Sequence, residues 1–243
     1  MVVVDASRDP KIGRKFEIAT REVSVEQLHR FRPGHYSNLA TAPTDDCPAN
    51  VVIWFTAVAY CQWLSERERI PEQDWCYPPL RELDDPNRPV LELTQIPAVD
   101  LTKTGYRLPT MDEWEFACGA GAVTSRCYGE ADELLANYAW YRANSKERSW
   151  PGGRLKPNDF GLFDMLGNIA EWSGDRYGDR PGDRPDDKVH VWMAGSGTYG
   201  ASAEHLHTVT PDYALPRTDW NSYGFRIART HPAKSPAVDS ARP

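Results

Sequence analysis

The sequence has no long apolar run, no leader-like pattern in its first residues and no excess of basic residues, and each of these argues against a class of protein. No stretch reaches the roughly 18 apolar residues of a transmembrane helix, so no membrane segment is expected. Residues 1–5 have neither the basic region nor the apolar core of a signal peptide, and the chain as given is expected to be cytoplasmic or a fragment of a larger protein. The net charge of −7 argues against a nucleic-acid partner, because a polyanion needs a basic surface.

Cysteine is also scarce, and its spacing excludes the common zinc sites. The five cysteines form no CxxC pair, and none follows Cys127. Their odd number leaves at least one unpaired within the chain. Most are expected to be small buried apolar side chains, while one disulfide stays open as an alternative. They are Cys47, Cys61, Cys76, Cys118 and Cys127.

Aromatic and turn-forming residues are abundant instead. The 243 residues include 9 Trp and 11 Tyr, whose ring N–H and O–H groups need partners inside a core. The 17 Gly and 20 Pro indicate many turns. Few helices, short strands and long loops predict one irregular α+β domain over residues 1–230, followed by a disordered tail at 231–243.

Three helices have start signals in the sequence. Ser24 with Gln27, and Thr110 with Glu113, have the spacing of a capping box, in which side chains and backbone of the first turn satisfy one another. A third helix is expected to begin after Thr56 as its cap. Proline-rich or polar segments at 78–104 and 178–187 indicate surface loops. Short strands are expected at 16–20, 191–193, 197–199 and 224–229.

The ten residues at 163–172, FDMLGNIAEW, combine two acids with a tight turn. Asp164 and Glu171 are too far apart for one helical turn, yet a chain that loops back at 167–168 would bring them together. Their carboxylates and nearby backbone carbonyls are the hard oxygen ligands that Ca²⁺ prefers. On spacing alone, a turn followed by a strand with two solvated acids is favoured, since acids near turns are common.

Five short phrases stand in a fixed order along the chain. They are GYRLPT at 105–110, EWEFA at 113–117, PNDFGLFDMLGN at 157–168, EW at 171–172 and GFRIAR at 224–229. Together they resemble the formylglycine-generating enzyme, or sulfatase-modifying factor, family over about residues 16–229. Each phrase alone is weak, but five in this order are specific. The resemblance implies a C-type-lectin-like fold with little regular secondary structure.

The resemblance also implies a structural Ca²⁺ site in the 163–172 run, which reverses the preference based on spacing alone. Its ligands would be the side chains of Asp164 and Glu171 and the carbonyls of Gly167 and Ile169. A family member can have Asn where Asp164 stands, and the exchange keeps an oxygen ligand.

A second family site would begin at Asn137 with the carbonyl of Tyr138. Its later acidic ligand falls in a segment that is shorter here, where Asn144 could substitute for it. The alternative for Asn137 is an ordinary turn or cap.

Departures from the family pattern bear on catalysis. In the oxidase that the chain resembles, two cysteines after a Gly-Gly-Ser-aromatic phrase bind copper, and the matching phrase here is SGTY at 196–199. The cysteine positions then fall on Ala201 and Leu206, and neither can supply the thiolate that Cu(I) selects. Ala170 stands where a tryptophan is expected. No copper is therefore expected.

Histidine offers little support for an iron enzyme. A branch of the family uses non-haem iron, with histidines that come largely from an additional helical domain, which is not expected within the chain as given. His205 and His207 could share one face of a strand, but with no third ligand nearby they make a poor facial triad. Exposed or hydrogen-bonded histidines are the favoured interpretation.

The leading hypothesis is a catalytically inactive, lectin-like binding module whose ligand surface comes from residues 199–223. This segment mixes aromatic anchors with adaptable polar side chains, and its position matches the hypervariable region of retroelement-diversified variable proteins, some of which resemble this family. The alternative is a structural loop with core aromatics. The candidate ligand-binding residues are Tyr199, Glu204, His205, His207, Asp212, Tyr213, Arg217, Asp219 and Trp220.

Two other hypotheses stay open. One is a divergent copper or non-haem iron oxidase or oxygenase that works with another domain. The other is a regulatory or scaffolding domain of a larger signalling protein. The sequence does not say whether the ligand is a protein or a small molecule.

Overall fold

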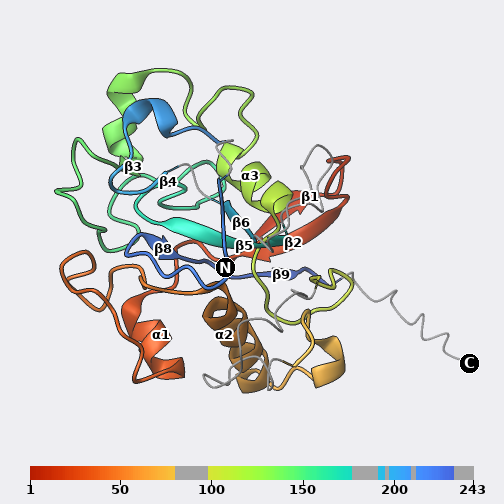
Figure 1. Cartoon of the computed structure of the whole chain (residues 1–243). Coiled ribbons are helices and arrows are strands. Elements are labelled where there is room, and N and C mark those ends of the chain that lie inside the picture. The colour runs from red at the N-terminus through yellow and green to blue at the C-terminus, as the bar shows by residue number, and fades with distance from the viewer. Residues whose placement is uncertain (80–97, 177–190, 195–196, 209–211, 233–243) are drawn as a thin grey trace, which may run out of the picture.

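The strands form the middle layer of the molecule, with α1 and α2 on one side and α3 on the other (Figure 1). The computed structural model describes residues 1–79, 98–176, 191–194, 197–208 and 212–232. Its helices are α1 (Val25–Phe31), α2 (Trp54–Arg67) and α3 (Met111–Gly119), with short 3-10 helices η1 (Glu72–Asp74), η4 (Asp132–Asn137) and η5 (Ala203–His205). Its strands are β1 (Val2–Ala6), β2 (Arg14–Ile18), β3 (Ala139–Trp140), β4 (Leu166–Gly167), β5 (Ala170–Arg176), β6 (Val191–Ala194), β7 (Asp212–Ala214), β8 (Tyr223–Gly224) and β9 (Ala228–Thr230).

Three small sheets connect these strands. The first has the order β1-β2-β9, with antiparallel pairs, and so joins the two ends of the described chain. The second is the parallel pair β3-β4. The third has the order β7-β6-β5-β8, in which β5 and β8 run parallel. Short strands and long connections confirm the expected α+β class with modest regular structure.

Both predicted capping boxes are present. Ser24 accepts a hydrogen bond from the Gln27 amide at 3.2 Å, and its own amide donates to the Gln27 side chain at 3.0 Å. The Thr110 amide donates to Glu113 Oε2 at 3.0 Å, and the Glu113 amide donates to Thr110 Oγ1 at 3.1 Å. These contacts join residues three apart, which is why the sequence could predict them.

The predicted cap of the second helix is wrong. Thr56 is buried inside α2, which begins at Trp54 after an extended Ile53. The Trp54 amide donates to the carbonyl of Pro216 at 3.0 Å. A distant segment of chain therefore satisfies an amide of the first turn, and no side-chain cap is needed there.

The strand predictions have mixed outcomes. Strands β2 and β6 confirm the strands expected at 16–20 and 191–193, within a few residues. Residues 197–199 form no strand, because Gly197 has φ +79° and turns the chain. The run 224–229 divides between β8 and β9. Most of the predicted loops at 78–104 and 178–187 lie outside the described residues.

Two large apolar clusters fill most of the interior, one on each side of the strand layer, and a small third one contains Val25, Ala42 and Cys47. The first includes Trp54, Trp172 and Phe225, and the second includes Phe16, Trp114 and Leu206. Several tryptophan N–H groups find partners, as expected: that of Trp54 donates to Ser173 O at 2.8 Å and that of Trp172 to Val52 O at 2.7 Å, whereas that of Trp140 is buried with no partner among the described residues. All five cysteines are free, and four are buried, which confirms the apolar interpretation.

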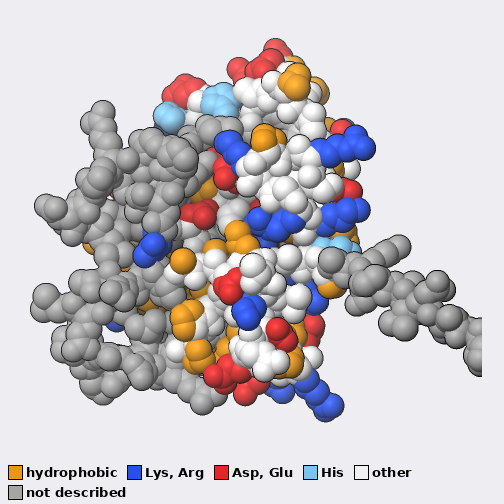
Figure 2. Space-filling model, turned by 90° about the vertical axis from the view of Figure 1, so that its right-hand side faces the viewer, with side chains coloured by type: hydrophobic (Ala, Val, Ile, Leu, Met, Phe, Trp, Pro, Cys, Tyr) orange, Lys and Arg blue, Asp and Glu red, His pale blue; other side chains and the backbone are white. Residues whose placement is uncertain are grey.

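The end of the described chain is anchored to the first sheet. His231 donates its amide to Lys15 O at 3.2 Å, and its ring lies 2.9 Å from Glu17 Oε1, so His231 is ordered where the tail was expected to begin. The rest of the predicted tail, from 233 on, lies outside the described residues. On the face in Figure 2, acidic and basic side chains of the described residues are interspersed. Within the described ranges, no helix combines the length and the apolar character needed to span a membrane.

Candidate functional site

The 163–172 run turns tightly at the centre of the fold and includes β4 and the first residues of β5. Asp164, Gly167 and Asn168 all have positive φ values, from 55° to 74°, and the chain turns back as expected. A Cβ on Gly167 would lie 2.2 Å from the carbonyl oxygen of Trp140, so only glycine fits there. Asp164 and Glu171 are 2% and 1% exposed, so neither acid is solvated.

Glu171 is held in a buried ion pair with Arg226. Its Oε1 accepts a hydrogen bond from Arg226 Nη2 at 2.7 Å, and its Oε2 accepts one from Arg226 Nε at 2.7 Å. Trp114 Nε1 also donates to Oε2, at 3.0 Å. This bidentate geometry is the strong form of the arginine–carboxylate pair. Both oxygens of Glu171 are therefore already engaged.

Only one of the two carboxylate oxygens of Asp164 has a hydrogen-bond partner among the described residues. Its Oδ2 accepts a hydrogen bond from the Gly153 amide at 2.7 Å, whereas its Oδ1 is buried with no partner among the described residues. Burial raises the pKa of Asp164 to about 6. An unpartnered buried carboxylate oxygen is what a calcium ligand looks like without its ion, so Asp164 fits the expected site while Glu171 fits it poorly.

Glu22 completes this buried cluster, and the sequence reasoning missed it. Its Oε1 accepts a hydrogen bond from Asn168 Nδ2 at 3.0 Å, and its Oε2 is buried without a partner. Burial and the charge of Asp164 raise the pKa of Glu22 well above its usual value. Glu22 precedes the cap of α1, and no spacing in the sequence signals a contact with residues so far along the chain.

At the second predicted calcium site, protein groups bond to the carbonyl of Asn137 and to the side chain of Asn144. The carbonyl of Asn137 accepts the amide of Lys156 at 2.8 Å, and the Tyr138 ring stacks on Tyr128 at 4.5 Å with Lys156 Nζ 6.0 Å away. The Asn144 amide group bonds to the backbone of its own loop, through Tyr141 N at 2.8 Å and Ala139 O at 2.9 Å. A calcium ion here stays a prediction.

The two positions that match the copper-binding cysteines lie side by side. A Cβ added to Gly197 would lie 2.6 Å from Ala201 Cβ and 2.9 Å from Leu206 Cδ2, so both side chains approach the same glycine. Leu206 is fully buried in the second apolar cluster, against which Ala201 packs. The fold thus brings the two positions together, and both have hydrocarbon side chains without a thiol group.

The histidines lie on the surface around η5. His205 is exposed, with Nδ1 at 2.8 Å from Ser202 Oγ and 3.9 Å from Glu204 Oε1. His207 is partly buried, and its Nδ1 has no partner. Within the described ranges, no three His, Cys, Asp or Glu side chains are arranged to hold a metal ion.

The structure divides the candidate ligand-binding residues into two groups. The first group lies around η5 and contains Tyr199, Glu204, His205 and His207. Arg126 holds this segment in place, because it donates to Leu206 O at 2.9 Å and to Ala203 O at 3.1 Å. The second group, from β7 to the residue before β8, contains Asp212, Tyr213, Arg217, Asp219 and Trp220. In Figure 1, η5 lies beside η4 at the top, whereas β8 lies lower, towards α1.

The second group has the more accessible aromatic side chains. Trp220 is 64% exposed and stacks on Tyr223 with ring centroids 5.4 Å apart, so it is a surface residue. Tyr213 and Leu215 are 45% and 44% exposed. Tyr199 is only partly exposed, and burial raises the pKa of its phenol. Its amide donates to Asn168 O at 2.8 Å.

Comparison with known proteins places this geometry in context. The family described as "Sulfatase-modifying factor enzyme 1-like domain" matches residues 5–231. The formylglycine-generating enzyme of Mycobacterium tuberculosis is 33% identical over 178 residues, which cover 65% of this chain and 58% of that protein. The inactive C-alpha-formylglycine-generating enzyme 2 of Bos taurus is 29% identical over 140 residues, which cover 51% of this chain and 44% of that protein.

A solved structure extends the similarity over more of the chain. Treponema denticola variable protein 1 superposes with a TM-score of 0.74 at 25% identity, covering 89% of this chain and 85% of that one. By contrast, the chain spans about half the length of the curated relatives it matches.

Proposed function

The chain belongs to the family of sulfatase-modifying factor enzyme 1-like domains, and we propose that it acts there as a non-catalytic binding module. The observation that carries the proposal is the packing of Ala201 and Leu206 against Gly197. At the positions where the oxidase it resembles has two thiolates, this chain offers only carbon, which cannot bind Cu(I). The family also contains a protein named as inactive, in Bos taurus, to which this chain is similar.

The proposed ligand surface centres on the second group, between β7 and β8. Trp220, Tyr213 and Leu215 supply exposed apolar area, and Asp219 adds an exposed charge. Large aromatic side chains with few rotatable bonds lose little entropy on binding, which suits them as anchors. The first group around η5 lies elsewhere and would contribute polar contacts of its own.

The similarity to Treponema denticola variable protein 1 supports a more specific form of this proposal. The segment 199–223 would then be a retroelement-diversified surface. The genome around the coding sequence provides the test: an adjacent reverse transcriptase and a near-copy of this segment are expected, and the absence of both would contradict diversification.

A library of random peptides displayed on phage tests the ligand surface. Peptides selected on the wild-type chain should lose about thirtyfold or more of their affinity for the Trp220→Ala variant, since anchors of this kind contribute about 2 kcal/mol or more. Val3→Ala is the matched control, because Val3 is 55% exposed on β1, away from β8 (Figure 1). Equal binding to Trp220→Ala and wild type would contradict the proposed surface.

Calcium is the cofactor proposed for the central loop, in a structural role. Asp164, Gly167, Ile169 and Glu171 are the family-derived ligands, and the free oxygen of Asp164 supports the proposal. When bound, the ion would fix the loop between β4 and β5. The engagement of Glu171 by Arg226 leaves the ligand set incomplete.

A further inference from the structure

The loop of residues 142–156 is basic, although the chain as a whole is acidic. Its basic residues are Arg142, Lys146, Arg148, Arg154 and Lys156, and its one acid is Glu147. The segment 43–46 adds Asp45 and Asp46, so that the two segments together have five basic and three acidic residues and a net charge of +2. A local positive charge on a chain of net charge −7 favours a negatively charged partner at this place.

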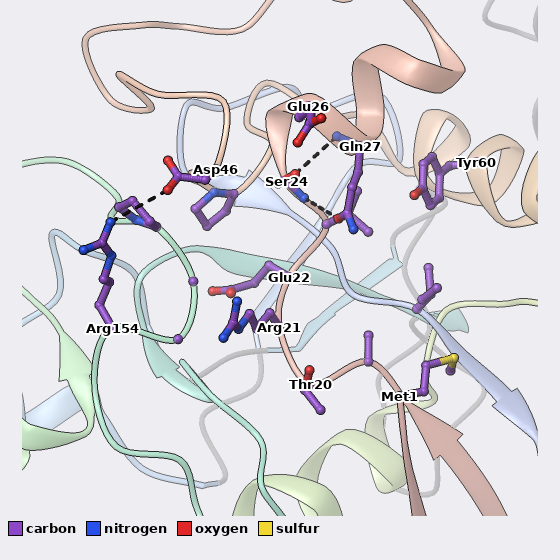
Figure 3. Close-up of a pocket in the computed structure, with 17 residues that line it drawn as sticks. Met1, Thr20, Arg21, Glu22, Ser24, Glu26, Gln27, Asp46, Tyr60 and Arg154 are labelled. Atoms are coloured by element: carbon purple, nitrogen blue, oxygen red, sulfur yellow. Dashed lines mark hydrogen bonds and ion pairs between the residues drawn. The ribbon is translucent and has the colours of Figure 1, made fainter.

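The two segments line a cavity of about 480 Å³. Its charged lining residues are Arg148, Arg154 and Asp46, and its apolar ones are Pro43, Trp140, Trp150, Pro151 and Leu155. Arg154 Nη2 lies 3.8 Å from Asp46 Oδ2, and in the neighbouring cavity of Figure 3, which shares these two residues, their side chains point towards each other. Arg148 pairs with no carboxylate of the described ranges and contacts an aromatic ring instead.

Arg148, Trp150 and Trp140 form a stack in the wall of the cavity. The guanidinium carbon of Arg148 lies 4.2 Å from the centre of the Trp150 ring, and the ring centres of Trp150 and Trp140 are 4.7 Å apart at an interplanar angle of 15°. Two groups cannot share one face of a ring at such distances, so Trp150 lies between the other two. A guanidinium over a ring keeps N–H groups free along its edge, where they can bond to a carboxylate.

Hydrogen bonds hold this wall in place. Trp150 Nε1 donates to Ser145 O at 2.7 Å, and the Trp150 amide donates to Asn168 Oδ1 at 2.9 Å. Ser145 Oγ in turn donates to Tyr199 O at 2.8 Å. Because the wall is already formed, a ligand that binds there loses little affinity to the ordering of side chains.

We propose that this cavity binds a short, extended segment of a partner protein in which an acidic residue stands next to an apolar one. The carboxylate would bond to the free edge of Arg148, and the apolar side chain would pack against Leu155 and the two prolines. Both faces of Trp150 are taken, so neither a sugar ring nor a nucleobase can stack on it. The hydroxyl of Thr44, the one uncharged polar side chain in the described lining, already donates to Asp46 at 2.6 Å, and a sugar would find few partners for its hydroxyl groups.

This second binding surface does not rest on the function proposed above. None of the candidate ligand-binding residues between 199 and 223 is among the described lining residues of the cavity. The two surfaces can therefore be tested separately.

Selection from a random peptide library displayed on phage tests the proposal. The full chain is the target at about 150 mM salt, because lower salt exaggerates the attraction between exposed charges. Phage that bind the double variant Arg148→Gln with Arg154→Gln are removed first. The remaining peptides should be enriched in Asp or Glu next to apolar residues. If no peptide is enriched, or if the selected peptides have the charge of the unselected library, the proposal is wrong.

The affinity of a fluorescent copy of the most enriched peptide then identifies the contacts. Arg148→Gln should weaken binding about tenfold or more, since arginine is frequent among the residues that dominate binding energy. Lys146→Gln is the matched control, because it removes the same charge from the same loop at an exposed residue outside the described lining, and it should change the affinity by less than about threefold. A peptide with serine in place of its apolar residues should bind about tenfold or more weakly. Equal midpoints of thermal unfolding show that the variants keep the fold.

Three results would overturn the proposal. A loss of affinity for Lys146→Gln as large as that for Arg148→Gln would indicate attraction to the whole loop rather than binding in the cavity. A serine peptide that binds as tightly as the original would remove the apolar contact. A labelled single-stranded DNA of similar length that binds more tightly than the peptide would indicate a nucleic-acid partner instead. Trp220→Ala should bind this peptide as the wild type does, so failure here is distinguishable from failure of the surface at Trp220.

Discussion

Loss of Arg226 should destabilise the fold more than loss of any surface ion pair. Arg226 is fully buried, bonds to both oxygens of Glu171 at 2.7 Å, and also donates to the carbonyls of Phe163 and Ala19 at 3.2 and 3.3 Å. Arg226→Met removes the guanidinium and leaves Glu171 buried beside Glu22 and Asp164. Breaking a buried pair in this way costs about 3–5 kcal/mol.

The expected loss is large enough to measure easily. For a chain of this size each kcal/mol shifts the unfolding midpoint by roughly 2–4 °C, so Arg226→Met should unfold roughly 6–20 °C below the wild type. Urea unfolding in chelator gives the free energy without a contribution from bound metal ions. The double variant Glu171→Gln with Arg226→Met removes both charges and keeps an acceptor for Trp114 Nε1. It should recover at least half of the loss.

A small effect would refute this reasoning. A cost below about 1 kcal/mol for Arg226→Met is what an exposed pair would give. In that case the guanidinium would not be the buried partner of Glu171. A double variant as unstable as the single one would show that the cost comes from lost packing rather than from unpaired charge.

Four further predictions concern one or two positions each. Leu206→Ala should lower the free energy of unfolding in urea by about 2–5 kcal/mol, because Leu206 is fully buried. The double variant Ala201→Cys with Leu206→Cys should create a Cu(I) site, which copper titration would detect. Gly167→Ala should fail to fold or lose more than about 2 kcal/mol of its free energy of unfolding, since Gly167 has a φ of +74° and the new Cβ would meet the carbonyl of Trp140. A variant that unfolds with the same free energy as the wild type would contradict this turn geometry. Burial lowers the pKa of His35 below its usual value of 6.5, so the unfolded state binds more protons than the folded state just below pH 6.5. The free energy of unfolding should therefore fall as the pH drops through this value. His35→Gln should reduce that fall, which unfolding curves between pH 7 and 5 would measure.

Local signals in the sequence were reliable where the physics is local. The capping boxes of Ser24 and Thr110 join residues three apart, so the sequence alone could place α1 and α3. Thr56 failed as a cap because Pro216, far along the chain, satisfies the first turn of α2. Residues 197–199 failed as a strand because Gly197 turns the chain at a positive φ.

In the candidate site too, the local turn could be predicted from the sequence and the contacts between distant residues could not. The turn at Gly167 was visible in the sequence, and family resemblance placed Asp164 and Glu171 at its ends. Nothing in the spacing could show that Arg226 takes Glu171, or that Glu22 reaches Asn168 from the other end of the chain. The exposure of Trp220 was open in the sequence, since an aromatic residue before GFR suits either core or surface, and tertiary packing decides it.

Elemental analysis of the purified full chain tests the central claim most directly, that this is a binding module without redox chemistry. The carbon side chains of Ala201 and Leu206 predict no copper in a stoichiometric amount, and the lack of a three-ligand His, Cys, Asp or Glu cluster among the described residues predicts no iron, after purification and after incubation with either metal. One equivalent of copper or iron per chain, lost on replacing His205 or His207, would contradict the claim and favour an enzyme.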